Sequence, residues 1–311
     1  MHLLVYLPLV VTVLAALAAR TLSDRLPPVT ATWLLTGSAV VLAATTGAVL
    51  GLLALTALIQ VPMIAATGDW SARFISQHDP ASLPVAILAG GALTVAATAA
   101  ARTLWRRGRA IAVAHRHARE LPGNGKVVIA EDEAPDAYTL PGVPCRIVVT
   151  TGMLRVLSRP EQRVLLAHER AHAAWYHYLF TTAARLAAAA NPLLRPVAAE
   201  VGYTVERWAD ERAAALTGDR KVTAHAIARA ALAAKETPVR DPDALGVIGA
   251  LARGKRPGPV PRRVAALLRP APRHNALLLL VALALVGVAG VSALAAARDL
   301  HALLELAQGG H

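Results

Sequence analysis

Cysteine and charge are both scarce in this chain of 311 residues. The single cysteine, Cys145, excludes an intramolecular disulfide and any metal cluster built on several cysteines. Charged residues account for 17% of the sequence, whereas a typical soluble domain carries about 25%. Hydrophobic residues make up 55%. The shortage of charge therefore predicts that part of the chain lies in a lipid bilayer.

Four apolar segments are candidates for membrane spans, and they lie in residues 3–19, 31–66, 83–101 and 276–297. The stretch 31–66 has no charged residue and is long for one span of about 20 residues. It can form one tilted helix, or a helix with an interfacial extension that breaks near Pro62. A tight hairpin that turns at residues 45–47 is the less favoured alternative.

These segments predict four regions in the chain. Residues 1–101 hold three transmembrane helices, and residues 102–275 form the one part large enough for a soluble domain. Residues 276–297 form a fourth transmembrane helix, and residues 298–311 are a short tail.

The distribution of arginine predicts how these regions are oriented. The formal net charge is +12, and arginines cluster after the first and third apolar segments and before the fourth. Loops on the cytoplasmic side of a membrane are enriched in Lys and Arg, so we expect residues 102–275 to face the cytoplasm. The amino terminus and the tail are then outside. A hairpin in residues 31–66 would move the amino terminus to the cytoplasm and leave residues 102–275 on the cytoplasmic side. Basic clusters beside apolar runs favour contact with anionic lipid, and no nucleic-acid partner is expected.

The region 102–275 reads as mainly helical with a small β-sheet. Residues 126–130 and 146–150 are rich in β-branched residues and predict two strands, with Gly152 at the exit of the second. Ser158 and Glu161 have the spacing of a capping box, which predicts a helix from about Arg159. Further helices are expected over residues 202–216, ending at Gly218, and over residues 222–234. Residues 253–273 are rich in Pro, Gly and basic residues and are expected to be a linker.

The predicted helix after Ser158 carries the sequence H-E-R-A-H at residues 168–172. Residues four apart lie on one face of a helix, so the imidazoles of His168 and His172 can bind a single metal ion. Glu169 is then placed to act as general base and acid on a metal-bound water. A bound Zn²⁺ makes that water acidic near neutral pH, which amide hydrolysis requires.

Two histidines leave the metal shell incomplete, because a catalytic zinc takes three protein ligands and keeps one open position. The next strong helix carries Glu206 and Asp210, one turn apart. Glu206 is the predicted third ligand, and Asp210 is predicted to form a hydrogen bond to a ligating histidine. His177 lies five residues after His172, which is off the metal-binding face of a continuous helix, so we expect a structural or substrate-side role for it.

This pattern, H-E-x-x-H followed by E-x-x-A-D, resembles the gluzincin membrane peptidases. Two neighbouring types qualify, the BlaR/MecR type and the HtpX/CAAX-protease type. The short interval from His172 to Glu206 and the pair Asn191-Pro192 favour the BlaR/MecR type. Residues 137–142 and 146–154 resemble the segment before the zinc helix in both types, and the resemblance implies that this strand forms the rim of the cleft, where a peptide substrate adds as an extra strand.

One departure from the BlaR/MecR sensors concerns the tail. Those sensors carry a large penicillin-binding domain after the last span, and residues 298–311 are too short for one, so we do not expect direct β-lactam sensing.

The expected function is that of a zinc endopeptidase that acts on a protein or peptide. The expected substrates are a transcriptional repressor or, as in HtpX-like quality control, a misfolded membrane protein. A non-catalytic membrane signalling scaffold is the alternative from another class, and a homo-oligomer is left open.

Overall fold

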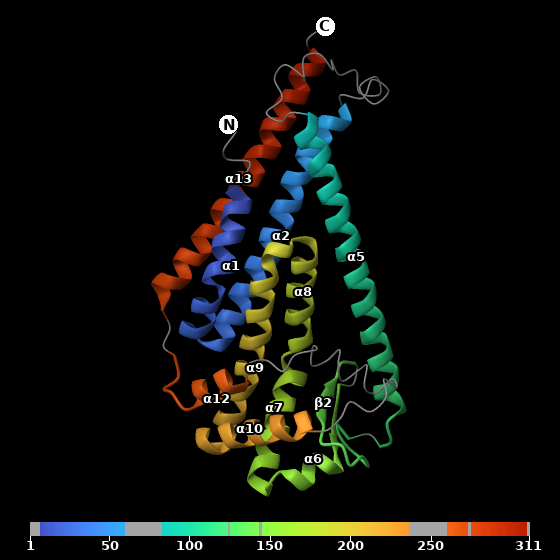
Figure 1. The fold of residues 1–311 in the computed structure, drawn as a ribbon, viewed down its shortest axis with the longest axis vertical. Helices are drawn as coiled ribbons and strands as arrows, with labels where there is room; N and C mark the ends of the chain where they lie inside the picture. Colours follow the sequence, from blue (N-terminus) through green and yellow to red (C-terminus); the bar gives the residue numbers. More distant parts are fainter. Residues whose placement is uncertain are drawn as a thin grey trace.

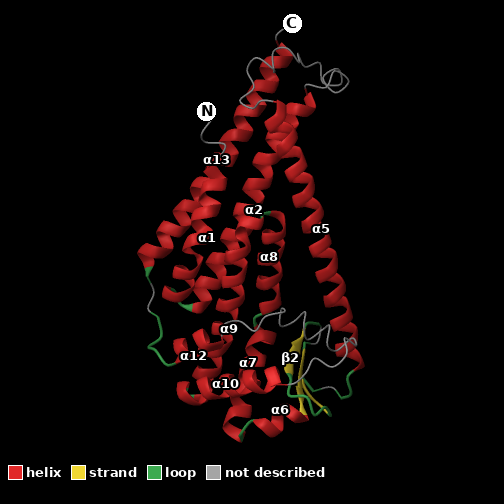
Figure 2. Cartoon of the chain, viewed as in Figure 1, coloured by secondary structure: helices red, strands yellow, loops and turns green. Residues whose placement is uncertain are grey.

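A computed structural model describes residues 7–59, 83–123, 125–142, 145–236, 260–272 and 275–309. Helices make up most of these residues, and the three strands among them form one small sheet (Figures 1 and 2). Long helices form one end of the molecule, and the sheet and the shorter helices form the other. The predicted class, mainly α with a small sheet, is confirmed.

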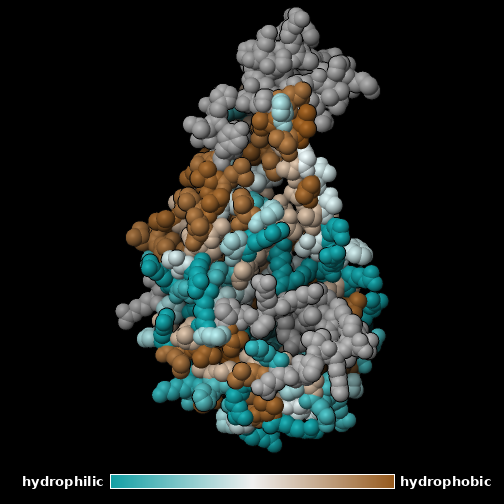
Figure 3. All heavy atoms as spheres, viewed as in Figure 1, coloured by the Kyte–Doolittle hydropathy of each residue, from teal (hydrophilic) through white to brown (hydrophobic). Residues whose placement is uncertain are grey.

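Among the described residues, four helices are long and apolar enough to cross a membrane: α1 (Leu7–Arg25), α2 (Pro28–Ile59), α5 (Leu83–Glu120) and α13 (Ala276–Gly309). Their outward-facing residues include many large hydrophobic side chains, such as Leu17, Trp33, Leu88 and Leu277. Hydrophobic surface accordingly gathers over these helices, and hydrophilic surface gathers mostly over the opposite end (Figure 3). This arrangement is compatible with a multi-pass membrane protein.

The second apolar segment forms one helix and not a hairpin. Helix α2 runs without interruption through Thr45, Thr46 and Gly47, where the alternative placed a turn. A turn inside lipid leaves backbone N–H and C=O groups without their helical hydrogen-bond partners, which costs free energy. The continuous helix keeps these hydrogen bonds. Pro62, near which the interfacial extension was expected to break, lies outside the described residues.

Two of the apolar helices extend beyond their predicted spans. Helix α5 continues from the apolar residues through the basic stretch to Glu120, so the apolar segment and the basic extension form one helix of 38 residues. Helix α13 continues to Gly309, so most of the predicted tail is helical.

The sheet consists of β1 (Val127–Ala130), β2 (Ala137–Leu140) and β3 (Arg146–Thr150), in the order β1-β3-β2. Strands β1 and β3 pair in parallel, and β2 pairs antiparallel to β3. The two predicted strands are confirmed, and β2 is an addition. Because β3 is central and buried along its whole length, it cannot accept an added strand; β2 borders the sheet on the side of the helix that carries the histidines.

Gly152 is required where the chain leaves β3. A Cβ atom at this position would lie 2.1 Å from the carbonyl oxygen of Glu133. The Gly152 amide donates to the carbonyl of Asp132 (2.8 Å), which holds the turn before β2 against the start of α6 (Thr151–Val156).

The chain then forms α7 (Arg159–Ala174), α8 (His177–Ala190), the short 3-10 helix η2 (Pro192–Leu194), α9 (Arg195–Thr217) and α10 (Arg220–Glu236). Helix α9 ends at Gly218 in the left-handed region (φ 73°), as predicted. Helix α8 and the first half of α9 form a hairpin that packs against α1, α2 and α5 (Figure 1). At its tip the Asn191 side chain donates to the Thr46 hydroxyl (3.2 Å), far inside the apolar part of α2.

The expected linker 253–273 contains a helix, α12 (Val260–Leu267). The prediction is therefore wrong for these eight residues, and the residues of the linker before 260 lie outside the described residues. Val260, Val264 and Leu267 recur at helical spacing, and they pack against α9 and α10 through Ala214, Ala224 and Ile227. The apolar face outweighs the Pro and the two arginines that suggested a linker.

Candidate metal centre

Helix α7 presents His168 and His172 on one face. Its start is set by the capping box, in which the Ser158 amide donates to the Glu161 carboxylate (2.8 Å). Val164, Ala167 and Ala171 are buried, which fixes the rotation of the helix and turns the histidines toward α9. The sequence therefore determines both the start of this helix and the face that it presents.

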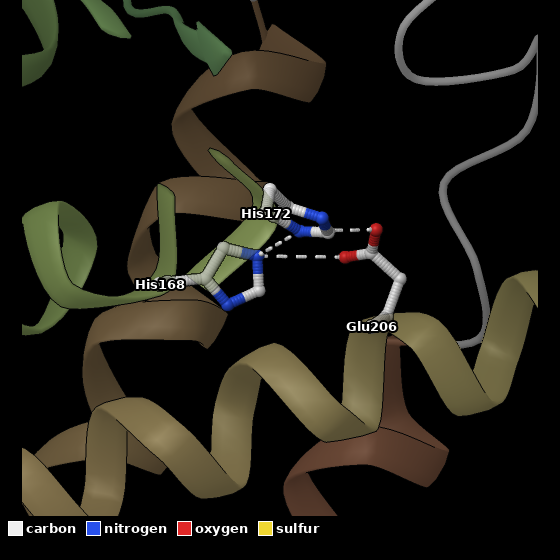
Figure 4. Close-up of side chains that lie close together, drawn as sticks. All are labelled: His168, His172 and Glu206. Carbon is white, nitrogen blue, oxygen red and sulfur yellow. Dashed lines mark hydrogen bonds and ion pairs between the residues drawn. The ribbon is translucent and has the colours of Figure 1, made fainter. Parts of the chain in front are cut away.

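Glu206 of α9 meets the two histidines (Figure 4). The Nε2 atoms of His168 and His172 are 3.0 Å apart. The Glu206 carboxylate oxygens lie 3.6 Å from Nε2 of His168 and 3.5 Å from Nε2 of His172. Donor atoms of a tetrahedral zinc, at about 2.0–2.1 Å from the metal, are about 3.3 Å apart. The three side chains thus fit a single zinc ion, and each of them offers one ligand atom to it.

Asp210 contacts the other nitrogen of His168. Oδ1 of Asp210 lies 3.0 Å from Nδ1 of His168, and the carboxylate is almost fully buried. This contact favours the tautomer with the proton on Nδ1, which leaves the Nε2 lone pair facing Glu206. Burial disfavours the charged imidazole, but Asp210 and Glu206 outweigh burial and raise the pKa of His168 to about 10. A metal that binds here must therefore displace a proton.

Arg263 of α12 was missed by the sequence analysis as part of this cluster. Its guanidinium donates to both oxygens of Asp210 (2.7 and 2.6 Å) and lies 2.9 Å from Glu206 Oε2. Burial alone would raise the pKa of Glu206, but Arg263 and the histidines hold it well below its usual value. Both carboxylates are thus ionised, as metal binding requires. The spacing of the apolar residues of α12 was the only signal in the sequence that could have placed Arg263 on a helix.

His177 also belongs to the cluster, but it contacts His172 and is not among the three residues that could hold the metal. The expectation that it lies off the metal-binding face assumed a continuous helix. The chain instead breaks after α7, where Tyr176 adopts a left-handed conformation (φ 48°). The break brings Nδ1 of His177 to 3.0 Å from Nδ1 of His172. Burial and the adjacent His172 lower the pKa of His177 to about 3, so the ring is neutral and can accept the Nδ1 proton of His172.

Glu169 points toward the sheet. The Thr139 hydroxyl, on β2, donates to the Glu169 carboxylate (2.8 Å) and lies 3.0 Å from its carbonyl oxygen. Glu169 is buried, and the bordering strand β2 therefore sets the position of its carboxylate. Thr139 is a second residue that the sequence analysis missed, because its strand was not predicted.

Residues 100–195 match peptidase family M48. The matched range contains β1 to β3 and the His-Glu-x-x-His helix, and it ends before Glu206. No curated protein and no solved structure matches the chain. The match supports a metallopeptidase, and peptidases of this family are generally zinc-dependent; it lends no support to the BlaR/MecR type in particular.

Proposed function

We propose that this protein is a membrane-embedded zinc endopeptidase. His168, His172 and Glu206 hold the zinc ion, and Asp210 orients His168. The observation that carries the proposal is the convergence of three donor atoms from α7 and α9 at the spacing of a zinc shell, within a chain that matches a metallopeptidase family.

The chemistry follows from the residues around the metal. A zinc ion bound here would polarise a substrate carbonyl and acidify a water molecule. Glu169 takes a proton from the attacking water and passes it to the leaving amine. Thr139 holds the Glu169 carboxylate on the side of β2, where the backbone of a bound peptide can pair with this strand. The rim strand that the resemblance implied is therefore assigned to β2.

The first experiment compares purified wild-type protein with Glu169→Gln. We expect both proteins to bind one zinc ion, because Glu169 is not a ligand in this proposal. Hydrolysis of fluorescently labelled casein should fall about 10²–10⁴-fold in the variant, the usual contribution of a general acid and base. Chelation should abolish wild-type activity, and added zinc should restore it.

The matched control is Glu120→Gln, which changes an exposed carboxylate at the end of α5 and should leave activity unchanged. Wild-type protein without bound zinc, or a Glu169→Gln variant as active as wild type, would contradict the proposal.

The orientation of the site is also a proposal. We propose that it faces the cytoplasm, because the arginine-rich ends of the apolar helices lie on the same side as α7 and α9. A reporter fused after Arg119 should behave as cytoplasmic, and one fused after Arg298 as external. The reverse pattern would place the site outside the cell.

The proposed substrates are proteins at the membrane, a repressor or a misfolded membrane protein among them. A comparison of protein levels between cells with the wild-type protein and cells with Glu169→Gln would identify them.

A further inference from the structure

Two adjacent arginines of α12 contact two different parts of the molecule. Arg263 holds Asp210 and Glu206 in the metal centre. Arg262 donates to Asp24 (3.0 and 2.7 Å) and to the hydroxyl of Ser23 (2.7 Å), at the end of α1. The short helix α12 therefore joins the metal centre to the last turn of α1.

The same turn is also attached to α9 on either side of the proposed ligand Glu206. Arg262 donates to both oxygens of Glu200 (2.9 and 2.9 Å), and its guanidinium lies 3.7 Å from the ring centroid of Tyr203. The Glu200 carboxylate accepts from the Ser23 hydroxyl. The buried Arg207 donates to the Ser23 carbonyl oxygen (2.6 Å).

The other end of α12 is held as well. Arg220 donates from Nε to the Leu267 carbonyl oxygen (2.8 Å) and pairs with Glu211 of α9. Helix α12 thus has its carboxyl end fixed by Arg220 of α10, and Arg262 fixes its amino end on α1 and α9. A shift of this amino end would move Arg263, because the two residues are neighbours on a single helical turn.

We infer that the last turn of α1 positions the metal ligands. Ser23 and Asp24 hold Arg262, Arg262 sets the place of α12, and Arg263 on that helix fixes the carboxylates of Asp210 and Glu206. The planar guanidinium of Arg263 suits this task, since its fork of donors binds carboxylates in one geometry. The inference deepens the proposed function and rests on it: the position of α1 against α9 and α12 would control zinc affinity.

A double-mutant cycle on the full-length protein in detergent tests this route. The measured quantity is the zinc dissociation constant, by competition with a chelator of known affinity. Arg263→Gln should weaken zinc binding about 10–100-fold, as loss of a partner of a metal ligand does. Arg262→Gln should weaken it about 3–10-fold, and the double variant should be no weaker than Arg263→Gln alone, because the second residue acts through the first.

Two further variants complete the design. Asp24→Asn changes a half-exposed partner of Arg262 and disturbs the structure less than the arginine substitutions do. It replaces the double variant if that protein does not fold, and we expect it to bind zinc more weakly than wild type. Arg229→Gln is the matched control, since Arg229 links α10 to Glu161 of α7 (3.0 Å) away from the metal centre, and its zinc affinity should equal that of wild type.

The outcomes separate the two proposals. Additive losses in the cycle, or unchanged zinc affinity in both Arg262→Gln and Asp24→Asn, would overturn the coupling and leave the peptidase proposal standing. A wild-type protein that binds no zinc would overturn both. Zinc-bound Arg262→Gln should also show a lower kcat on casein with KM little changed, whereas a defect confined to protein yield would indicate a structural role alone.

Discussion

Replacement of Asp210 by asparagine tests the metal centre most directly. The variant keeps the size of the side chain and one oxygen facing Nδ1 of His168 (3.0 Å in the wild type). It removes the negative charge that this imidazole and the Arg263 guanidinium share. Zinc affinity should therefore fall, while the three proposed ligands all remain in place.

The size of the effect follows from the hydrogen bond that changes. A hydrogen bond to a charged group contributes about 1.5–3 kcal/mol, and one between neutral groups about 0.5–1.5 kcal/mol. The loss is then about 1–1.5 kcal/mol, or roughly tenfold in the dissociation constant. Asp210→Ala removes the contact altogether and also deprives Arg263 of a buried partner, so we expect a loss of about 10–100-fold.

Chelator competition in detergent measures both constants, and thermal unfolding of the zinc-free proteins reports on folding separately. Asp219→Asn is the control, because Asp219 is an exposed cap that accepts from the Lys221 and Val222 amides (2.8 and 2.9 Å), a role that asparagine fills equally well. If Asp210→Asn binds zinc as tightly as the control, Asp210 does not orient a zinc ligand and the reasoning is refuted.

Three further substitutions test other contacts. Thr139→Val should lower kcat about tenfold with zinc affinity unchanged, because it removes a hydrogen bond to the Glu169 carboxylate. A tenfold loss of zinc affinity in this variant would contradict the prediction. His177→Phe keeps a ring against Trp208 but removes the hydrogen-bond acceptor for the His172 imidazole, so zinc should bind about tenfold more weakly. Unchanged zinc affinity would show that His177 does not contribute to zinc binding. Gly152→Ala should lower the free energy of unfolding by about 1–3 kcal/mol, since its Cβ meets a backbone carbonyl at 2.1 Å. Gly202→Ala, with nothing within 4 Å, is its control in thermal unfolding.

Local patterns in the sequence were sufficient for the elements that depend on near neighbours. The capping box at Ser158 and the apolar positions of α7 determine where that helix begins and which face carries His168 and His172. Gly218 ends α9, because a left-handed residue there costs glycine little. The absence of charge in the long apolar stretches likewise predicted the four helices that can cross a membrane.

The parts of the centre that depend on contacts between distant residues were decided only by the tertiary structure. Helical periodicity did not predict the contact of His177 with His172, because a single left-handed residue at Tyr176 redirects the chain, and no local pattern marks that break. Arg263 is 53 residues from Asp210 in the sequence, and the composition around it suggested a linker. The sequence thus determined which residues could bind zinc. The packing of α12 and β2 decided which residues surround those ligands, since that packing depends on apolar contacts between separate elements.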